Sequence, residues 1–116
     1  MWRDPAWVLD MFQAAKKVLE YASGLTETSF LANSRDQDAI VRQLTILGEA
    51  AKRVSEDFRN EHPEIPWKKI AGLRDVVVHD YFHIDLEKVW RIIREDLPDL
   101  IEVLKRIVPP EEEDNE

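Results

Sequence analysis

The sequence predicts an all-α protein, an antiparallel bundle of four to five helices around one hydrophobic core. Two observations support this class. Four segments repeat apolar residues with the 3.6-residue period of a helix, and no stretch alternates apolar and polar residues as a half-buried strand does. The chain has 116 residues, enough for one core but not for two domains. We therefore expect a helical domain over residues 1–108 and an acidic, disordered tail over residues 109–116.

The first helix is expected to begin at Pro5, with Asp4 as its N-cap, and to stop at Gly24. Proline suits the first helical turn, and glycine suits the position just beyond the last one. A short turn over residues 27–32, capped by Thr26, should follow. The apolar stripe of the first helix consists of Val8, Met11, Phe12, Ala15, Val18, Leu19 and Ala22.

The second long helix should start near Ser34 or Asp36 and run to about Asn60. Its apolar residues are spaced alternately by four and three positions, as in helical bundles. It has to end before residues 62–66, because the two prolines of that segment cannot lie inside a helix. The apolar seam consists of Ile40, Leu44, Leu47, Ala51, Val54 and Phe58.

A third helix is expected from Trp67 to about residue 81 or 82, and Asp85 should cap a fourth. Pro98 falls inside the apolar pattern of the fourth helix, which predicts a kink near residues 95–97. The seam of the fourth helix consists of Leu86, Val89, Trp90, Ile93, Leu97, Leu100, Leu104 and Ile107.

Apolar side chains surround most of the third helix, and a helix that is apolar on all sides has to be buried on all sides. In a chain this small, a second subunit is the natural source of that cover. We therefore expect a homodimer with the third helix at or beside the interface. The residues concerned are Ile70, Ala71, Leu73, Val76, Val77 and Val78.

The net charge of −8 is concentrated in the tail, which has five acids and no base after Pro110 and leaves 19 acids against 16 bases before it. Such a balance opposes binding of a long polyanion but allows a local phosphate site. The absence of cysteine excludes disulfides, thiolate metal sites and cysteine nucleophiles. No apolar run approaches the ~20 residues that cross a bilayer, so we expect a cytoplasmic protein with no membrane contact.

Residues 72–83 contain the side chains best suited to catalysis or ligand binding. Arg74 lies in line with apolar residues of the third helix, and burial of its guanidinium would be costly without an acid or a ligand anion. A structural interpretation pairs it with a carboxylate of Asp75, Glu49 or Asp80. A functional interpretation makes it an anion-binding group, and both remain open.

Arg74, His79 and Tyr81 form an Arg-x4-His-x-Tyr string. At 100° per residue, Arg74 and Tyr81 share a helix face, whereas His79 lies about 140° from Arg74. One straight helix cannot direct Arg74 and His79 at the same phosphate. Either the helix is distorted near His79, or a twofold-related copy supplies the second group.

This string resembles the Arg-x4-6-His signature of the HEPN superfamily, and its Arg-x4-His-x-Tyr form resembles the HepT toxin branch, the former domain of unknown function 86. The similarity covers the chain from Pro5 to Val108. One position differs, because many members have Asn where this chain has Asp75. The matching surroundings are residues 46–50 (ILGEA), 65–67 (IPW), 70–75 (IAGLRD), 81–85 (YFHID), 89–90 (VW) and 96–98 (DLP).

The resemblance implies an all-α dimer of HEPN type that acts as a metal-independent RNA endonuclease, without a cofactor, and as the toxin of a toxin–antitoxin pair. Arg74 would hold the scissile phosphate. His79 would be the general base or acid, since imidazole exchanges protons near neutral pH. Tyr81 would be AMPylated by a small nucleotidyltransferase antitoxin, and Asp75 and Glu49 would be supporting residues.

Other interpretations stay open. The main alternative function is a non-catalytic HEPN module that binds nucleotide or the partner transferase. On an unbroken helix, Asp75, His79 and His83 would project three metal ligands from one side, although no metal is expected.

The remaining candidates have simpler structural explanations. Glu49 could form a helix salt bridge with Arg53. His62 is expected to be structural or incidental, and Trp67 and Trp90 are expected to anchor the core. Four basic residues could flank an RNA path or decorate a solvated face, namely Lys68, Lys69, Arg91 and Arg94.

Overall fold

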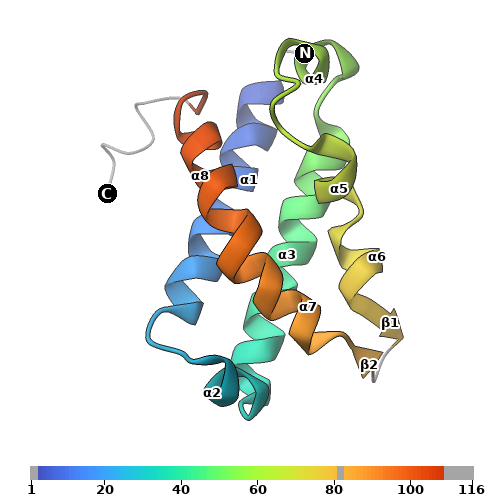
Figure 1. Cartoon of the computed structure of the whole chain (residues 1–116). Coiled ribbons are helices and arrows are strands. Elements are labelled where there is room, and N and C mark those ends of the chain that lie inside the picture. The colour runs from blue at the N-terminus through green and yellow to red at the C-terminus, as the bar shows by residue number, and fades with distance from the viewer. Residues whose placement is uncertain (1–2, 81–82, 109–116) are drawn as a thin grey trace.

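The computed structural model describes residues 3–80 and 83–108, and it confirms the all-α class, with one small two-stranded sheet added (Figure 1). The elements in chain order are α1 (Asp4–Ala22), α2 (Glu27–Leu31), α3 (Ser34–Arg53), α4 (Glu56–Glu61), α5 (Trp67–Ala71), α6 (Leu73–Val77), β1 (Val78–Asp80), β2 (His83–Ile84), α7 (Leu86–Arg91), the π-helical turn η1 (Ile92–Asp96) and α8 (Leu97–Lys105).

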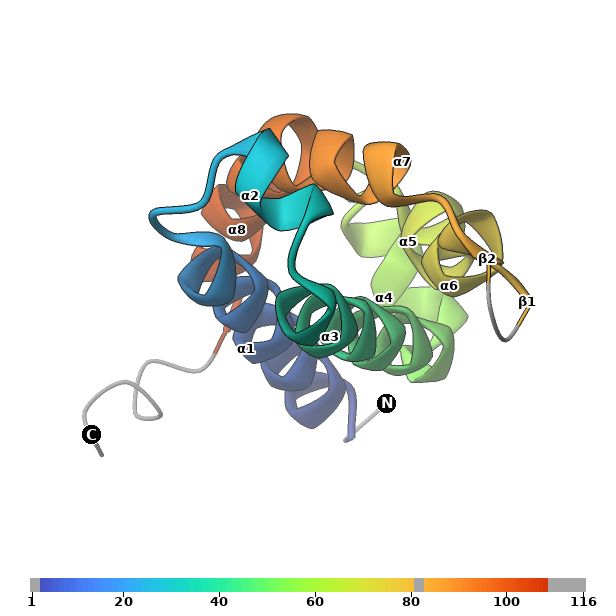
Figure 2. The ribbon, with the colours of Figure 1, turned by 90° about the horizontal axis from the view of Figure 1, so that it is seen from below.

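Successive segments of the bundle run in opposite directions. In Figure 1, α1 descends, α3 returns upward, α5 and α6 descend, and α7 leads upward into α8. The view from below shows α1 and α3 side by side, with α5 and α6 flanking α3 and with α7 and α8 on the opposite side (Figure 2). The arrangement is therefore an antiparallel bundle.

The predicted apolar stripes form the core. Val8, Met11 and Val18 of α1 pack fully buried with residues of α3 and α8. The α3 seam is buried up to Val54, and Phe58 is half-buried. The main members from α3 and α8 are Ile40, Leu44, Leu47, Leu97 and Leu104.

The first helix differs from the prediction at its N-terminus. Arg3 occupies the N-cap position, and Asp4 lies inside α1 without capping it. The Asp4 carboxylate instead accepts hydrogen bonds from the Ser55 backbone N–H at 2.9 Å and from Ser55 Oγ at 2.7 Å. Burial acts to raise the pKa of Asp4, but these hydrogen bonds together with the positive charge of the N-terminal amine hold the pKa below its ordinary value. The end of α1 is as predicted, because Gly24 has a φ of 82°.

The second long helix does not reach Asn60, as the sequence had suggested. It ends at Arg53, and Ser55 caps a separate short helix, α4, by accepting a hydrogen bond from Phe58 N–H at 3.2 Å. Arg59 of α4 donates from Nη2 to the carbonyls of Ala51 and Lys52, at 3.0 Å each. The last carbonyls of α3 are thereby satisfied after the chain turns.

The third helix is also shorter than predicted. It divides at Gly72 into α5 and α6, and it ends at Val77 instead of residue 81 or 82. Three consecutive β-branched residues, Val76, Val77 and Val78, favour an extended chain at this point. Residues 81 and 82 lie outside the described part of the chain.

Most of the apolar surface of the third helix is buried by the chain itself. Ile70, Leu73 and Val77 are buried, Val78 is half-buried, and the Val76 side chain is exposed. The expectation that a second subunit has to bury the whole circumference of this helix is therefore too broad. Val76 is the apolar residue of α6 that is left for contact with a second subunit.

The fourth helix is capped and distorted where predicted. Asp85 Oδ1 accepts a hydrogen bond from Lys88 N–H at 3.1 Å, and the π-helical turn η1 directly precedes the helix that contains Pro98. Proline lacks an N–H, so the regular hydrogen-bond ladder cannot continue through it.

Within residues 3–80 and 83–108, no helix combines the length and apolar character needed to cross a bilayer.

Candidate functional site

The candidate site lies where α6 gives way to the two-stranded sheet. Val78 pairs with Ile84 and Asp80 pairs with His83 in an antiparallel hairpin whose register is irregular between the two pairs. The Asp85 N–H donates to the Val77 carbonyl at 2.7 Å and closes the base of the hairpin. The helix thus ends between the arginine and the histidine of the predicted string.

Arg74 is exposed, which contradicts the expectation that it lies among buried apolar side chains. Its side chain is 56% accessible, and its Nη1 lies 3.6 Å from Oδ1 of Asp75, which is 72% accessible. Asp75 is thus the partner, as one interpretation proposed, but the pair is a surface pair. The guanidinium is accessible to a ligand that can compete with one exposed carboxylate.

His79 lies on β1 and is exposed. The helix ends before it, so the calculation that placed His79 about 140° from Arg74 around one straight helix does not apply. Of the two arrangements considered, the structure has the interrupted helix. Within the described residues, Arg74 and His79 form no hydrogen bond or ion pair with each other. Tyr81 lies outside the described residues.

The metal-site alternative required Asp75, His79 and His83 to project from one helix. They lie on α6, β1 and β2 respectively, so the helical spacing on which this alternative rested is absent. Within residues 3–80 and 83–108, no group of three or more histidine, aspartate or glutamate residues is arranged to bind a metal.

Glu49 is on the exposed side of α3. It pairs with Lys52 at 3.3 Å instead of with Arg53, whose guanidinium lies over the ring of Trp7 at 5.3 Å from its centroid. Within the described residues, Glu49 forms no hydrogen bond or ion pair with Arg74, although α3 packs against α6. The neighbouring residue, Gly48, allows α3 to pack closely against α5, because a Cβ at position 48 would lie 3.0 Å from the Ile70 carbonyl oxygen.

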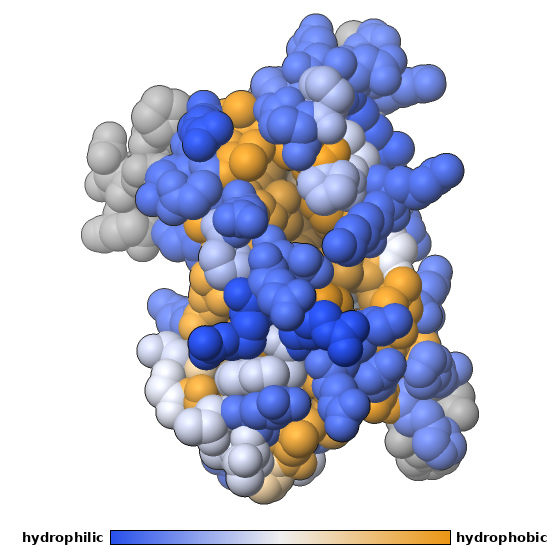
Figure 3. All heavy atoms as spheres, in the orientation of Figure 1, coloured by the Kyte–Doolittle hydropathy of each residue, from blue (hydrophilic) through white to orange (hydrophobic). Residues whose placement is uncertain are grey.

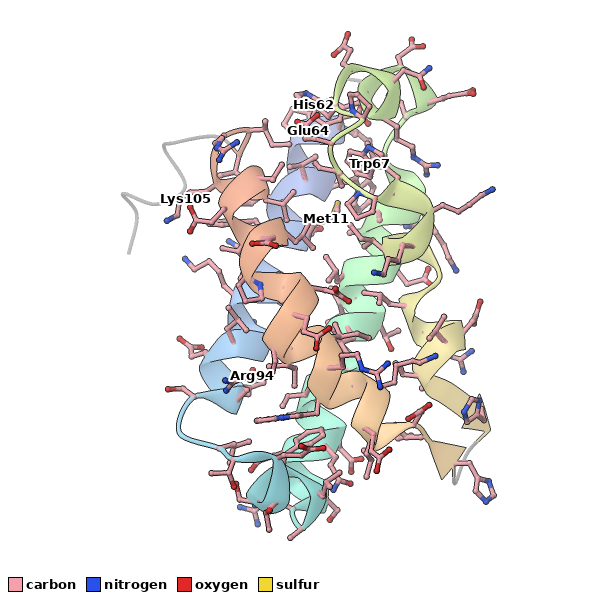
Figure 4. The ribbon with its side chains drawn as sticks, viewed as in Figure 1. Met11, His62, Glu64, Trp67, Arg94 and Lys105 are labelled. Carbon is pink, nitrogen blue, oxygen red and sulfur yellow. The ribbon has the colours of Figure 1, made fainter. Side chains whose placement is uncertain are left out.

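The aromatic residues pack as structural anchors. Trp67 is buried, and its Nε1–H donates to the carbonyl of His62 at 2.9 Å, while His62 Nδ1 lies 3.4 Å from Glu64 (Figure 4). His62 therefore helps to order the loop before α5. Trp90 is half-buried and stacks on Phe30 with ring centroids 5.4 Å apart.

The four basic residues considered as an RNA path are all exposed. Lys69 pairs with Asp96 at 3.6 Å, and the Arg94 guanidinium lies 5.9 Å from the centre of the Trp90 ring. Lys68 and Arg91 form no ion pair within the described residues. The contact between Asp4 and Ser55 was not predicted from the sequence. Its local indication was Ser55 followed by two acidic residues, a pattern typical of a helix start.

Comparison with known proteins gives a consistent result. The family model described as Ribonuclease HepT-like matches residues 11–107, which include Arg74, His79 and Tyr81. A protein of Methanocaldococcus jannaschii named "Putative RNase MJ1380" is 37% identical over 93 residues, which is 80% of this chain and 85% of the relative.

Two further relatives cover similar shares. "Putative RNase MJ0127" of the same organism is 34% identical over 111 residues, 96% of this chain and 92% of the relative. "Probable ribonuclease HepT" of Thermococcus cleftensis is 37% identical over 91 residues, 78% of this chain and 83% of the relative. No solved structure matches the chain significantly.

Proposed function

Because the chain belongs to the HepT-like ribonuclease family, we propose that it is a metal-independent RNA endonuclease whose catalytic residues are Arg74 and His79. The observation that supports this proposal most directly is the exposure of both side chains on the two sides of one helix-to-strand junction. A large polyanionic substrate can reach such side chains without opening the core. Relatives named as ribonucleases agree with this class of activity.

The proposed reaction needs no metal. Arg74 binds the non-bridging oxygens of the scissile phosphate and stabilises the charge that grows on them. Neutral His79 accepts the proton of the ribose 2′-hydroxyl, and the 2′-oxygen attacks phosphorus. The bond from phosphorus to the 5′-oxygen breaks, and that oxygen takes a proton from water or from a protonated imidazole. The products are a cyclic phosphate, which can open to a 3′ phosphate, and a 5′-hydroxyl end.

Asp75 and Glu49 are proposed as supporting residues, and the contacts in the structure favour Asp75 more than Glu49. Asp75 Oδ1 lies 3.6 Å from Arg74 Nη1, so it can orient the guanidinium before RNA binds, and the phosphate then has to displace it. Glu49 has weaker support, because its carboxylate pairs with Lys52 and not with Arg74. The two copies of a homodimer would bring two such junctions into one cleft, which is why the dimer belongs to the proposal.

The test of this proposal is an RNA cleavage assay with Arg74→Ala beside the control Arg91→Ala. Both arginines are exposed, so neither variant should lose more than about 0.5 kcal/mol of stability. Arg74→Ala should reduce the rate by about 10²- to 10³-fold, as for loss of one transition-state donor. Equal rates for Arg74→Ala and wild type would contradict a catalytic Arg74.

The toxin–antitoxin role is proposed from the same family membership. In this setting a small cytoplasmic nucleotidyltransferase attaches AMP to Tyr81 and so blocks access of RNA. Incubation with the cognate transferase and ATP should add one AMP by intact mass, and Tyr81→Phe should abolish the addition. Modification of Tyr81→Phe at the wild-type level would place the modified residue elsewhere.

A non-catalytic module that binds nucleotide or the transferase is the second candidate. The net charge of −8 favours it, because a nuclease of long RNA generally benefits from a basic surface. Nucleotide binding without cleavage, in protein whose Tyr81 is confirmed free by mass, would support this candidate over the nuclease.

A further inference from the structure

An apolar pocket of about 210 Å³ lies between α5 and the η1–α8 segment, and Leu73 at the start of α6 also lines it. Its deep wall includes Ile70, Ile92, Leu97 and Leu100. Figure 3 shows the opening as apolar surface bordered by hydrophilic side chains. A dry cavity of about 150 Å³ admits benzene, so this pocket has room for one aromatic or aliphatic side chain.

The rim of the pocket is acidic. Glu64, Glu95, Asp96 and Asp99 line it, and Lys69 is the basic residue among its lining residues. Lys69 is already paired with Asp96 at 3.6 Å across the opening. Glu95 and Asp99 are exposed and form no ion pair with any described residue. Two carboxylates one helical turn apart are thus left for a cation supplied from outside.

The wall that presents these carboxylates has an unusual backbone. Glu95 and Asp96 lie in the π-helical turn η1, which sets their side chains beside the opening. Single π-helical turns frequently occur at functional sites. The distortion has a local cause in Pro98, and its result is a fixed arrangement of acids around an apolar pocket.

We propose that this pocket is a docking site for a partner protein, which inserts one apolar side chain between α5 and α8 and sets lysine or arginine residues against Glu95 and Asp99. A central apolar anchor with flanking charge pairs is a common form of peptide recognition. The proposal does not depend on the ribonuclease activity.

Charge complementarity selects this occupant over the others. RNA would bring phosphates to a rim of carboxylates, so it is repelled. The residues after Pro110 are acidic and unsuited to the same rim. A second copy of this chain is acidic as well, with 19 acids against 16 bases before the tail, and the expected dimer places it against Val76 of α6 instead. A basic segment of a different protein satisfies both the apolar wall and the acidic rim.

The test uses a random dodecapeptide library displayed on phage, selected on the full chain and counter-selected on Val103→Trp. Val103 lines the pocket and is half-buried, so a tryptophan there should fill the space. Selected peptides should contain one large apolar residue flanked by lysine or arginine. A synthetic copy of one selected peptide should bind Val103→Trp at least tenfold more weakly than wild type.

The double variant Glu95→Gln/Asp99→Asn separates charge from shape and decides the case if Val103→Trp fails to fold. It should weaken the same peptide by about three- to tenfold, and the effect should shrink in high salt. The matched control Glu102→Gln removes an acid that is paired with Lys105, and should not change binding.

Three results would overturn the proposal. One is that no peptide is enriched, or that the enriched peptides are acidic. Another is unchanged binding to both pocket variants. The third is that the pocket variants convert a wild-type dimer into a monomer, because the occupant would then be a second copy of the chain.

Discussion

Arg74 reaches solvent with its charge only partly compensated, since its one ion pair is with an exposed carboxylate at 3.6 Å. Exposed pairs of this kind contribute about 0.2–1 kcal/mol. A phosphate that makes two charged hydrogen bonds to the guanidinium can displace such a partner. In the proposed mechanism, Asp75 therefore competes weakly with the phosphate for the Arg74 guanidinium.

The first prediction concerns this competition. Asp75→Asn should raise kcat/KM for RNA cleavage by about two- to fivefold, because it removes a competing carboxylate whose pair with Arg74 contributes at most about 1 kcal/mol. The measurement is the cleavage rate at low ionic strength. Asp75→Asn combined with Arg74→Ala should show no gain over Arg74→Ala, whereas a gain in the double variant would mean that Asp75 acts through another group.

The second prediction concerns the pH dependence of stability. The pKa of Asp4 is lower in the folded chain than its ordinary value of 3.8, so its stabilising effect is complete above that value and is lost as pH falls through the folded pKa. Asp4→Asn should therefore lower the free energy of unfolding by about 1–2 kcal/mol at pH 7. The difference should narrow in acid.

Chemical denaturation at a series of pH values measures this effect, with Asp10→Asn on the exposed side of α1 as the control. The control should stay within about 0.5 kcal/mol of wild type at neutral pH. A deficit of Asp4→Asn that is the same at every pH would show that the lost packing, and not the charge, is responsible.

At the scale of elements, the close approach of α3 and α5 depends on Gly48. A Cβ at this position would lie 3.0 Å from the Ile70 carbonyl oxygen and 3.4 Å from that of Ala71. Both contacts are to backbone atoms, so α5 would have to move away.

The third prediction follows from that contact. Gly48→Ala should destabilise the protein by about 1–3 kcal/mol, despite the higher helix propensity of alanine. Gly72→Ala is the matched control, because its nearest contact would be an ordinary 3.5 Å to the Lys68 carbonyl oxygen. Thermal unfolding of both variants provides the comparison. An increase in stability for Gly48→Ala would contradict the tight packing of these two helices.

The helices were predictable where local sequence and tertiary packing agree. The stripe of α1, the caps Thr26 and Asp85, and the distortion before Pro98 all follow from period, capping and proline chemistry. The breaks after Arg53 and after Val77 were not predicted, because an apolar rhythm continues across each of them. At the first break, Ser55 capping and the distant Asp4 carboxylate outweigh that rhythm.

The candidate site was predictable as a set of residues but not as a geometry. The residue string was visible in the chain, yet the sequence placed Arg74 in line with apolar residues and left open whether the helix is distorted near His79. The valine run at residues 76–78 was counted as part of an apolar helix face, although its β-branched residues also favour the strand that the structure contains. Side chains point in different directions on a helix and on a strand, so the direction of the His79 side chain could not be predicted.

At the scale of the molecule, we expect a homodimer in which α5 and α6 lie at or beside the interface. Val76 of α6 is 43% exposed, the largest exposed fraction among the large apolar residues of the described chain, and it lies two positions after Arg74. Burial of this residue by a second copy would bring two candidate sites near each other.

The fourth prediction tests this arrangement. Val76→Asp should weaken dimerisation at least tenfold in sedimentation velocity over a range of concentrations. Leu31→Asp is the control, since Leu31 is 39% exposed but lies on α2, away from α6. A wild-type chain that stays monomeric at every concentration would contradict the dimer.

The most direct test of the central claim is RNA cleavage by the purified protein in excess chelator, with wild type beside His79→Ala and the exposed neighbour His83→Ala as control. The account predicts cleavage by wild type and His83→Ala, with 5′-hydroxyl and cyclic or 3′ phosphate ends, and a loss of about 10²- to 10⁴-fold in His79→Ala. Cleavage that stops in chelator, or that persists at the wild-type rate in His79→Ala, would contradict it.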